Sequence, residues 1–286
     1  MKNKHSLLKP NKATTFFVIV NSLFMIIAAA VMLIPILKVL SDSFDGMTNY
    51  GLNFIPQKFT VIGYKTIVSN SALYRPFFIS VVTALVGTGL ALFLTVTGAY
   101  VITQKDMPGR KIFVYVLLFT MIFHGGLIPS YLVMLDLHLI DTLWAIILPL
   151  SVNAYYLILM RNFFNEIPQS TVESAEIDGC APMSVLMRII LPMSRPAIAA
   201  IGLFYAVIYW NDFFNFTIYI NNPNLYNFQV KLIEIILDSE IRSTTQFNSI
   251  TMQNASIIVS IVPIIVIYPF LQKHFAKGLN LGAVKG

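Results

Sequence analysis

The chain has little of what builds covalent or metal-bound sites. It contains one cysteine, Cys180, in 286 residues. A single cysteine excludes a disulfide within the chain and a metal site built from several cysteines. The four histidines, His5, His124, His138 and His274, lie in separate segments, and none has a spacing typical of metal ligands. We therefore expect no metal and no cofactor to be bound by this chain.

Charged residues are also few. Only 11% of the residues are charged, whereas 57% are hydrophobic and the mean hydropathy is +0.75. Soluble domains carry about 25% charged residues, so the composition indicates a polytopic membrane protein. The net charge of +6 comes from basic residues scattered at the ends of apolar runs, which is typical of cytoplasmic loops and does not favour nucleic-acid binding. The phosphate-binding pattern Gly-x-x-x-x-Gly-Lys-Ser/Thr is absent, so the sequence predicts no ATPase site.

Six apolar runs are each long enough to cross a hydrocarbon core of about 30 Å at 1.5 Å per residue. They cover residues 16–37, 77–102, 112–135, 142–160, 197–220 and 254–271. The first run is too long for a signal peptide and is expected to remain as a span. Residues 124–129 suggest a broken helix in the third run. We expect an all-α membrane protein, with a permease domain over residues 14–272 between polar tails at 1–13 and 273–286.

The distribution of lysine and arginine predicts the orientation. One set of loops, which includes both termini, carries thirteen of these residues, and the other set carries six. Cytoplasmic loops are enriched in basic residues, so we expect both termini and the loop 162–196 to be cytoplasmic.

The loop 162–196 is a polar island between two apolar runs. Ser170 and Glu173 have the spacing of a helix capping box, with Pro168 before them, so we expect a short helix over 171–178. Gly179 suits a left-handed C-terminal cap. Either residue could serve the helix end alone, but together they favour a functional loop.

A second short helix is expected after that glycine corner. Pro182 is suited to the first position of a helix, and the second helix is expected to end before Leu191-Pro192. The island therefore has the pattern of two helices joined by a tight turn.

These residues resemble the EAA motif of ABC-importer permeases, which have a separate ATPase subunit. The matching segments are Glu173-Ser174-Ala175, Asp178-Gly179-Cys180 and Ile189-Ile190-Leu191-Pro192. Ser174 and Cys180 depart from the usual alanines, but both remain small. The resemblance implies that the first short helix is a coupling helix that docks on an ATPase holding ATP and Mg²⁺. Glu173 would make a charged contact there, and Gly179 would permit a close approach.

The resemblance covers nearly the whole chain. Residues 121–131, Trp210-Asn211-Asp212, Tyr268-Pro269-Phe270 and residues 282–286 are similar to carbohydrate-importer permeases of the maltose type, and most of all to the LplC/YtcP branch linked to oligo- and polysaccharide uptake. The resemblance implies a type I ABC-importer permease in the bacterial cytoplasmic membrane. Its partners would be a second, related permease subunit, two ATPase subunits and an extracytoplasmic sugar-binding protein. The outer loops 38–75 and 221–253 would meet the binding protein, and the tail 278–286 would extend toward the ATPases.

Polar and aromatic residues inside the spans are candidates for the substrate path, because sugars bind aromatic faces, amides and carboxylates. The candidates are Asn153, Tyr156, Tyr205, Tyr209, Trp210, Asn211 and Asp212, with Tyr155 and Asn215 beside them. Hydrogen bonding between helices is the alternative for each residue. A buried Asp212 would need a partner, and we expect water or another subunit to reach it.

Two other functions remain possible at this stage. An ion-coupled secondary transporter of a small polar solute would need ionisable residues in several spans and often has inverted repeats. Only His124 and Asp212 qualify, no repeat is visible, and packing is favoured for His124. A membrane scaffold without transport activity would not need a polar loop or a polar fifth span.

Overall fold

The computed structural model describes residues 12–47, 51, 53–123, 125–242 and 246–282. These residues form helices, and their one β-contact is an isolated antiparallel bridge between Asp45 and Phe59. The chain divides into two compact units. The first unit joins Met1–Ile67 to Ser239–Val259, and the second joins Val68–Asp238 to Ser260–Gly286.

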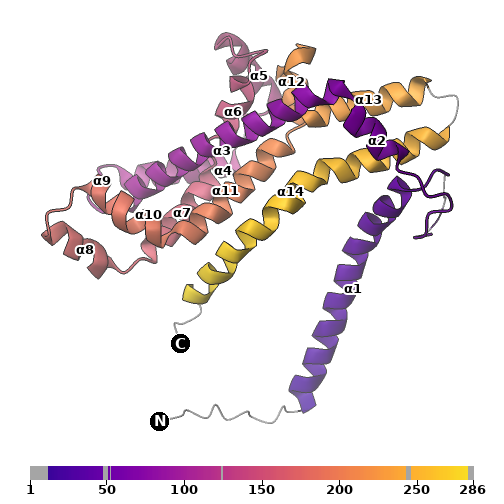
Figure 1. Cartoon of the computed structure of the whole chain (residues 1–286). Helices are drawn as coiled ribbons and strands as arrows, with labels where there is room; N and C mark the ends of the chain where they lie inside the picture. The colour runs from indigo at the N-terminus through magenta and orange to yellow at the C-terminus, as the bar shows by residue number, and fades with distance from the viewer. Residues whose placement is uncertain (1–11, 48–50, 52, 124, 243–245, 283–286) are drawn as a thin grey trace. The chain divides into compact units, whose positions relative to one another are not determined.

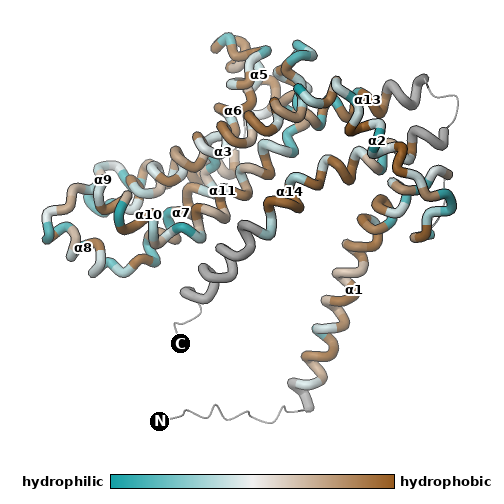
Figure 2. The backbone as a smooth tube through the Cα atoms, in the orientation of Figure 1, coloured by the Kyte–Doolittle hydropathy of each residue, from teal (hydrophilic) through white to brown (hydrophobic). Residues whose placement is uncertain are grey.

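The first unit is dominated by helix α1, Lys12–Ser43, whose 32 residues exceed the length needed to cross a bilayer. Its residues are hydrophobic along most of the helix (Figure 2), and most of its large apolar side chains are exposed within the described part of the first unit. A helix that is apolar all round is typical of surroundings of lipid or of another protein. Helix α2, Ile62–Ser69, follows, and Gly63 lies against Ala255 of helix α14, Gln246–Gly282.

The second unit is built on helix α3, Tyr74–Thr103. Helices α7, Ala154–Asn165, and α11, Arg195–Trp210, pack along it (Figure 1). Glycines permit this close packing: Gly87 lies under the ring of Tyr209, and Gly98 lies against Leu157. Gly89, in contrast, has open space beside it.

Shorter helices complete the described chain. They are η1 Ser71–Leu73, α4 Arg110–Ile122, α5 Leu127–Asp136, α6 Trp144–Leu150, α8 Gln169–Ile177, α9 Pro182–Val185, the π-helical turn η2 Leu186–Ile190, α10 Leu191–Met193, α12 Phe214–Tyr219, η3 Pro223–Leu225 and α13 Phe228–Arg242. Helix α13 lies within the loop 221–253 that the sequence predicts between the last two spans.

Three described helices are long and apolar enough to cross a membrane, and three bent helix pairs raise the possible number to six. The third apolar run is divided between α4 and α5, as expected, and His124 lies outside the described residues. Continuous helices over 142–160 and 197–220 are wrong: α6 and α7 meet at 48°, and α11 ends at Trp210 before α12 begins. Hydropathy alone does not reveal these breaks, because the residues on both sides of each break are equally apolar.

Candidate functional site

Helix α8 lies in the polar island and begins at Gln169, two residues earlier than the capping-box pattern predicts. Its N-cap is Pro168, and no side chain caps this end. The carbonyl oxygen of Pro168 accepts a hydrogen bond from the backbone N–H of Thr171 at 3.0 Å. Ser170 is therefore inside the helix, where its carbonyl oxygen accepts from the hydroxyl of Ser174 at 2.7 Å. The prediction of a Ser170 cap is wrong, because proline, with its fixed φ, begins the helix itself.

The corner after α8 has the predicted left-handed glycine. Gly179 has φ +79°, a region that residues with a Cβ rarely adopt. Its N–H donates to the carbonyl oxygen of Glu176 at 3.0 Å, and that of Cys180 donates to Ala175 at 2.9 Å. These two bonds form a Schellman motif, which satisfies the last carbonyls of α8. The turn reverses the chain at a fixed angle and leaves Gly179 exposed.

The second helical stretch begins at Pro182, as predicted, but it does not end before Leu191. It continues through the π turn η2 into α10 and stops at Ser194. In the π turn, the N–H of Leu191 bonds to the carbonyl oxygen of Leu186, five residues back. Pro192 has no N–H to donate and is accommodated at the start of α10. The chain then bends by 81° into α11.

The residues that match the EAA motif are mostly displayed at the surface. Glu173, Ser174, Asp178, Gly179 and Pro192 are exposed, Cys180 and Leu191 are half-buried, and Ala175 is buried. Ile177, the last residue of α8, is 85% exposed.

The inner side of α8 is fixed to the bundle by apolar packing. Ala175, Val185, Leu186 and Ile190 are buried in the same cluster as Met160 of α7 and Tyr205 of α11. In addition, the hydroxyl of Tyr100 donates to the carbonyl oxygen of Pro182 at 2.8 Å. A displacement of α8 would therefore be transmitted to α7 and α11 through side chains in direct contact.

A short polar chain links α8 to the end of α3. Lys105 Nζ donates to Gln169 Oε1 at 2.8 Å, and Gln169 Nε2 donates to Glu173 Oε1 at 2.6 Å. A groove of about 240 Å³ lies beside these residues and includes Asp106 and Glu176 in its lining. Glu173 thus lies within a charged, solvent-exposed network.

Three candidates for the substrate path are buried between helices. The hydroxyl of Tyr205 pairs with Thr95 of α3 at 2.9 Å and also accepts the backbone N–H of Asn153. The hydroxyl of Tyr209 donates to the carbonyl oxygen of Ile147 at 2.8 Å. Trp210 Nε1 donates to Ser260 at 3.0 Å. In this conformation all three are bonded between helices, which fits the alternative, and their place in a substrate path stays a prediction.

The four other candidates differ in exposure. Asp212 is buried, and both carboxylate oxygens accept hydrogen bonds from Asn215 at 3.0 and 3.1 Å. Asn215 thus supplies a partner for the buried carboxylate, and access of water or another subunit to Asp212 stays a prediction. Asn211 is exposed at the end of α11. Asn153 caps α7 by accepting the N–H of Tyr156, and both residues are half-buried.

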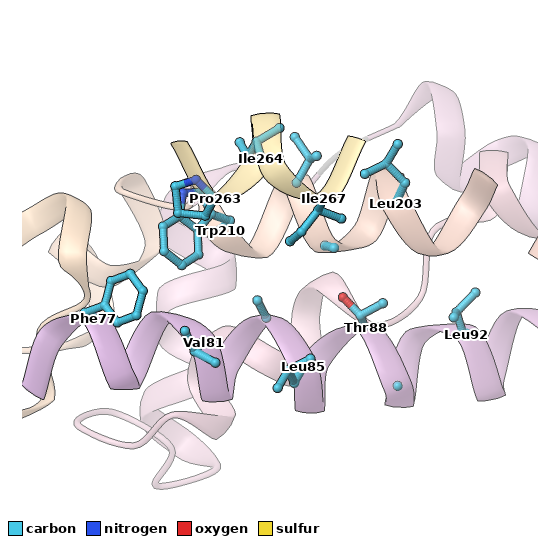
Figure 3. A pocket seen from close by; sticks show the side chains of 14 residues that line it. Phe77, Val81, Leu85, Thr88, Leu92, Leu203, Trp210, Pro263, Ile264 and Ile267 are labelled. Atoms are coloured by element: carbon cyan, nitrogen blue, oxygen red, sulfur yellow. The ribbon is translucent and has the colours of Figure 1, made fainter. Parts of the chain in front are cut away.

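One groove of the second unit is apolar (Figure 3). It has a volume of about 380 Å³ and lies between α3, α11 and α14, with Leu85, Trp210 and Ile267 in its wall. The hydroxyl of Thr88 lines it without a hydrogen-bond partner among the described residues. A sugar would leave most of its hydroxyl groups unsatisfied there, so the groove does not fit a carbohydrate site.

A turn between α5 and α6 is tied to the loop after α12, which sequence reasoning missed. Asp141 has φ +61°, and its carboxylate accepts the backbone N–H groups of Asn222, at 2.8 Å, and Asn221. These N–H groups hold the pKa of Asp141 below its usual value. Arg75 also donates to Asn224 at 3.3 Å. The loop that carries η3 is thereby held in one shape.

Comparison with known proteins agrees with the helical membrane fold. Residues 111–281 match the family of binding-protein-dependent transport system inner membrane components. The chain belongs to this family. It is 39% identical to protein LplC of Bacillus subtilis (strain 168) over 96% of this chain and 97% of LplC. It is 38% identical to the polygalacturonan/rhamnogalacturonan transport system permease protein YtcP of the same strain, over 92% of this chain and 96% of YtcP.

A solved structure shows the same fold. A bacterial ABC transporter involved in the import of the acidic polysaccharide alginate contains a chain that superposes with a TM-score of 0.81 at 28% identity. The match covers 93% of this chain and 98% of that one. This family member is therefore an ABC-importer permease, a multi-pass protein of the bacterial plasma membrane. Members of this family are the permease components of transporters that in general also contain ATPases, a partner permease and a binding protein.

Proposed function

We propose that this chain is a permease subunit of an ATP-driven importer of an oligosaccharide or polysaccharide fragment. The observation that carries the proposal is the near full-length similarity to YtcP and to a chain of the alginate importer, whose names both refer to polysaccharides. The exposed α8 loop supports a role that involves a second protein, since its outer face is exposed among the residues that the structure describes.

We further propose the orientation of the chain in the membrane and its contacts with the ATPase subunits. The termini and the loop 162–196 are cytoplasmic, and α8 is the coupling helix that docks on an ATPase subunit. ATP and Mg²⁺ are bound by the two ATPase subunits rather than by this chain. Glu173, Ser174, Asp178 and Gly179 contact the ATPase, while Ala175, Cys180, Leu191 and Pro192 shape the helices behind this surface.

On the face of the membrane opposite α8, the loop held by Asp141 is the proposed docking surface for the binding protein. Its conformation is fixed by bonds to Asn221 and Asn222, so it is pre-organised before a partner arrives. A second, related permease subunit completes the path. Closure of the ATPases on ATP moves α8, and the cluster around Ala175 and Ile190 transmits that movement to α7 and α11.

Reconstitution tests this proposal. The complete transporter, with its partner permease, ATPases and binding protein, is placed in proteoliposomes and supplied with labelled neutral and acidic oligosaccharides. We expect uptake of at least one of them that needs both ATP and the binding protein. Uptake driven by a proton or sodium gradient without ATP would instead support an ion-coupled transporter and contradict the proposal.

A further inference from the structure

The helix break between α6 and α7 is the starting point. Helix α6 ends at Leu150 and α7 begins at Ala154, so residues 151–153 interrupt a span. Irregular backbone at membrane depth is tolerated only where protein or water surrounds it, and transporters often place sites at such breaks. The bonds on the inner side are satisfied, because Asn153 donates to Tyr205 and caps α7.

The outer side of the break carries exposed aromatic rings. Tyr155 is 55% exposed, and its ring meets Tyr156 edge-on at 5.6 Å between centroids. Tyr156 in turn stacks on Phe204 of α11 at 5.7 Å, with 18° between the planes. Phe204 is 40% exposed. We call Tyr155, Tyr156 and Phe204 the aromatic ledge. Its rings are held from behind by Tyr205, whose centroid is 4.9 Å from Tyr156.

The aromatic ledge lies inside the apolar part of its span, which the sequence places over 142–160. Tyr155 follows Trp144 by 11 residues and precedes the charged Arg161 by 6, which places it roughly 9 Å along the helix from the nearer end. Phe204 is nine residues after Arg195, roughly 14 Å along α11. Interfacial tyrosines lie at the ends of spans instead. These two residues therefore do not belong to an interfacial aromatic belt.

The hydroxyl of Tyr155 has no hydrogen-bond partner among the described residues. A tyrosine hydroxyl in the hydrocarbon core without a partner is unfavourable, because the group loses its bonds to water. Tyr155 at this depth therefore indicates a wet surface rather than a lipid-facing one. An exposed aromatic face with a polar tip fits one ring face of a sugar, whose C–H groups pack on the ring while its hydroxyls bond at the edge.

We propose that the aromatic ledge is this chain's contact surface for a sugar ring during passage. The inference rests on the proposed function, since it requires a carbohydrate substrate. It moves the contact from buried Tyr205 and Tyr209 to their exposed neighbours. The ledge contains no charged side chain, so it holds the apolar face of a pyranose and does not distinguish neutral from acidic sugars. Recognition of a carboxylate belongs to other parts of the complete transporter.

The experiment compares variants of the complete transporter in proteoliposomes, with neutral and acidic oligosaccharides at concentrations below the KM. Tyr155→Ala removes the exposed ring, whereas Tyr155→Phe keeps it. Phe93→Ala is the matched control, because Phe93 is 62% exposed and lies 10 residues before the end of α3. We expect Tyr155→Ala to lower uptake about tenfold, by the loss of roughly 1.4 kcal/mol of contact energy. Tyr155→Phe is expected to stay within about threefold of the unsubstituted transporter, the Phe93 control to be unchanged, and neutral and acidic sugars to be affected equally.

Four results would overturn the proposal. Unchanged uptake by Tyr155→Ala would show that the ring of Tyr155 does not contact the sugar. A failure of that variant to co-purify with the partner permease would make the ledge a subunit interface. An effect confined to acidic sugars would indicate recognition of charge. If the unsubstituted transporter carries no carbohydrate, the proposed function fails as well, and this outcome is distinguishable from the other three.

Discussion

The ring of Tyr209 lies directly over Gly87. A Cβ placed on Gly87 would approach three carbon atoms of that ring to between 2.5 and 2.7 Å, which is closer than real contacts occur. The hydroxyl at the far end of the ring is bonded to the carbonyl oxygen of Ile147. One glycine on α3 therefore sets how α6 and α11 lie against that helix.

Gly87→Ala is expected to destabilise the bundle by about 1–3 kcal/mol, because the rigid and hydrogen-bonded ring cannot move away. Thermal unfolding of the purified complex measures the loss. Gly89→Ala is the matched control, since Gly89 has no atom within 4 Å of an added Cβ. Equal melting temperatures for the two variants would show that Tyr209 does not restrict this position.

Tyr205→Phe tests whether this tyrosine has a packing role. The substitution leaves the Thr95 hydroxyl and the Asn153 N–H without their partner in a buried place. We expect a stability loss of about 1–3 kcal/mol, together with an unchanged substrate range. Thermal unfolding and uptake are measured on the same preparation. A changed substrate preference at unchanged stability would show that Tyr205 contacts the substrate.

The pH dependence of the outer loop follows from Asp45. Burial raises the pKa of this carboxyl, but hydrogen bonds from the backbone N–H groups of Gln57, Lys58 and Met47, with the nearby charge of Lys38, outweigh it and lower the pKa. A lowered folded-state pKa means that this stabilisation is present above the unfolded pKa, about 3.9, and is lost as the pH falls through the folded value. We expect opening of these three hydrogen bonds to increase only below about pH 4.

Hydrogen exchange of the backbone N–H groups of Met47, Gln57 and Lys58, corrected for intrinsic exchange rates, measures this opening. Asp45→Asn is expected to weaken protection already at neutral pH, since a neutral amide accepts these bonds less strongly. Its opening should then no longer respond to acid. Equal protection of variant and unsubstituted protein at pH 7 would contradict the role given to Asp45.

Gly179 is expected to tolerate asparagine better than leucine. Its φ of +79° costs about 1–2 kcal/mol for a residue with a Cβ, and asparagine adopts this region most readily among such residues. Gly179→Leu should therefore lower uptake strongly and Gly179→Asn only mildly, with both proteins inserted in the membrane. Equal uptake by the two variants would show that neither the conformation nor the small size of Gly179 is needed.

Local backbone signals were the most predictable part of this molecule. The left-handed Gly179, Pro182 at a helix start and the break in the third run each depend on residues that are adjacent in sequence. The Ser170 cap failed for the same local reason, since Pro168 begins the helix in its place. The composition and length of the apolar runs sufficed for the all-α membrane fold.

Contacts between distant residues could not be predicted. The bonds from Tyr209 to Ile147 and from Trp210 to Ser260 join residues 62 and 50 positions apart. Sequence showed that these side chains were polar and in a span, but not that other helices already satisfied them. Their exposed neighbour Tyr155 was considered only as a secondary candidate. The sequence does not show which aromatic rings are exposed, and exposure distinguishes a ring that can bind a ligand from one that packs between helices.

The central claim is that α8 couples ATP hydrolysis in another subunit to sugar movement through this chain. The most direct test is the ratio of ATP hydrolysed to sugar imported by Glu173→Lys in proteoliposomes, with Glu166→Lys, an exposed residue before α8, as the control. We predict that Glu173→Lys abolishes most uptake while the chain still inserts, so that this ratio rises at least tenfold, and that the control is unchanged. An unaltered ratio and rate of uptake in Glu173→Lys would contradict the account.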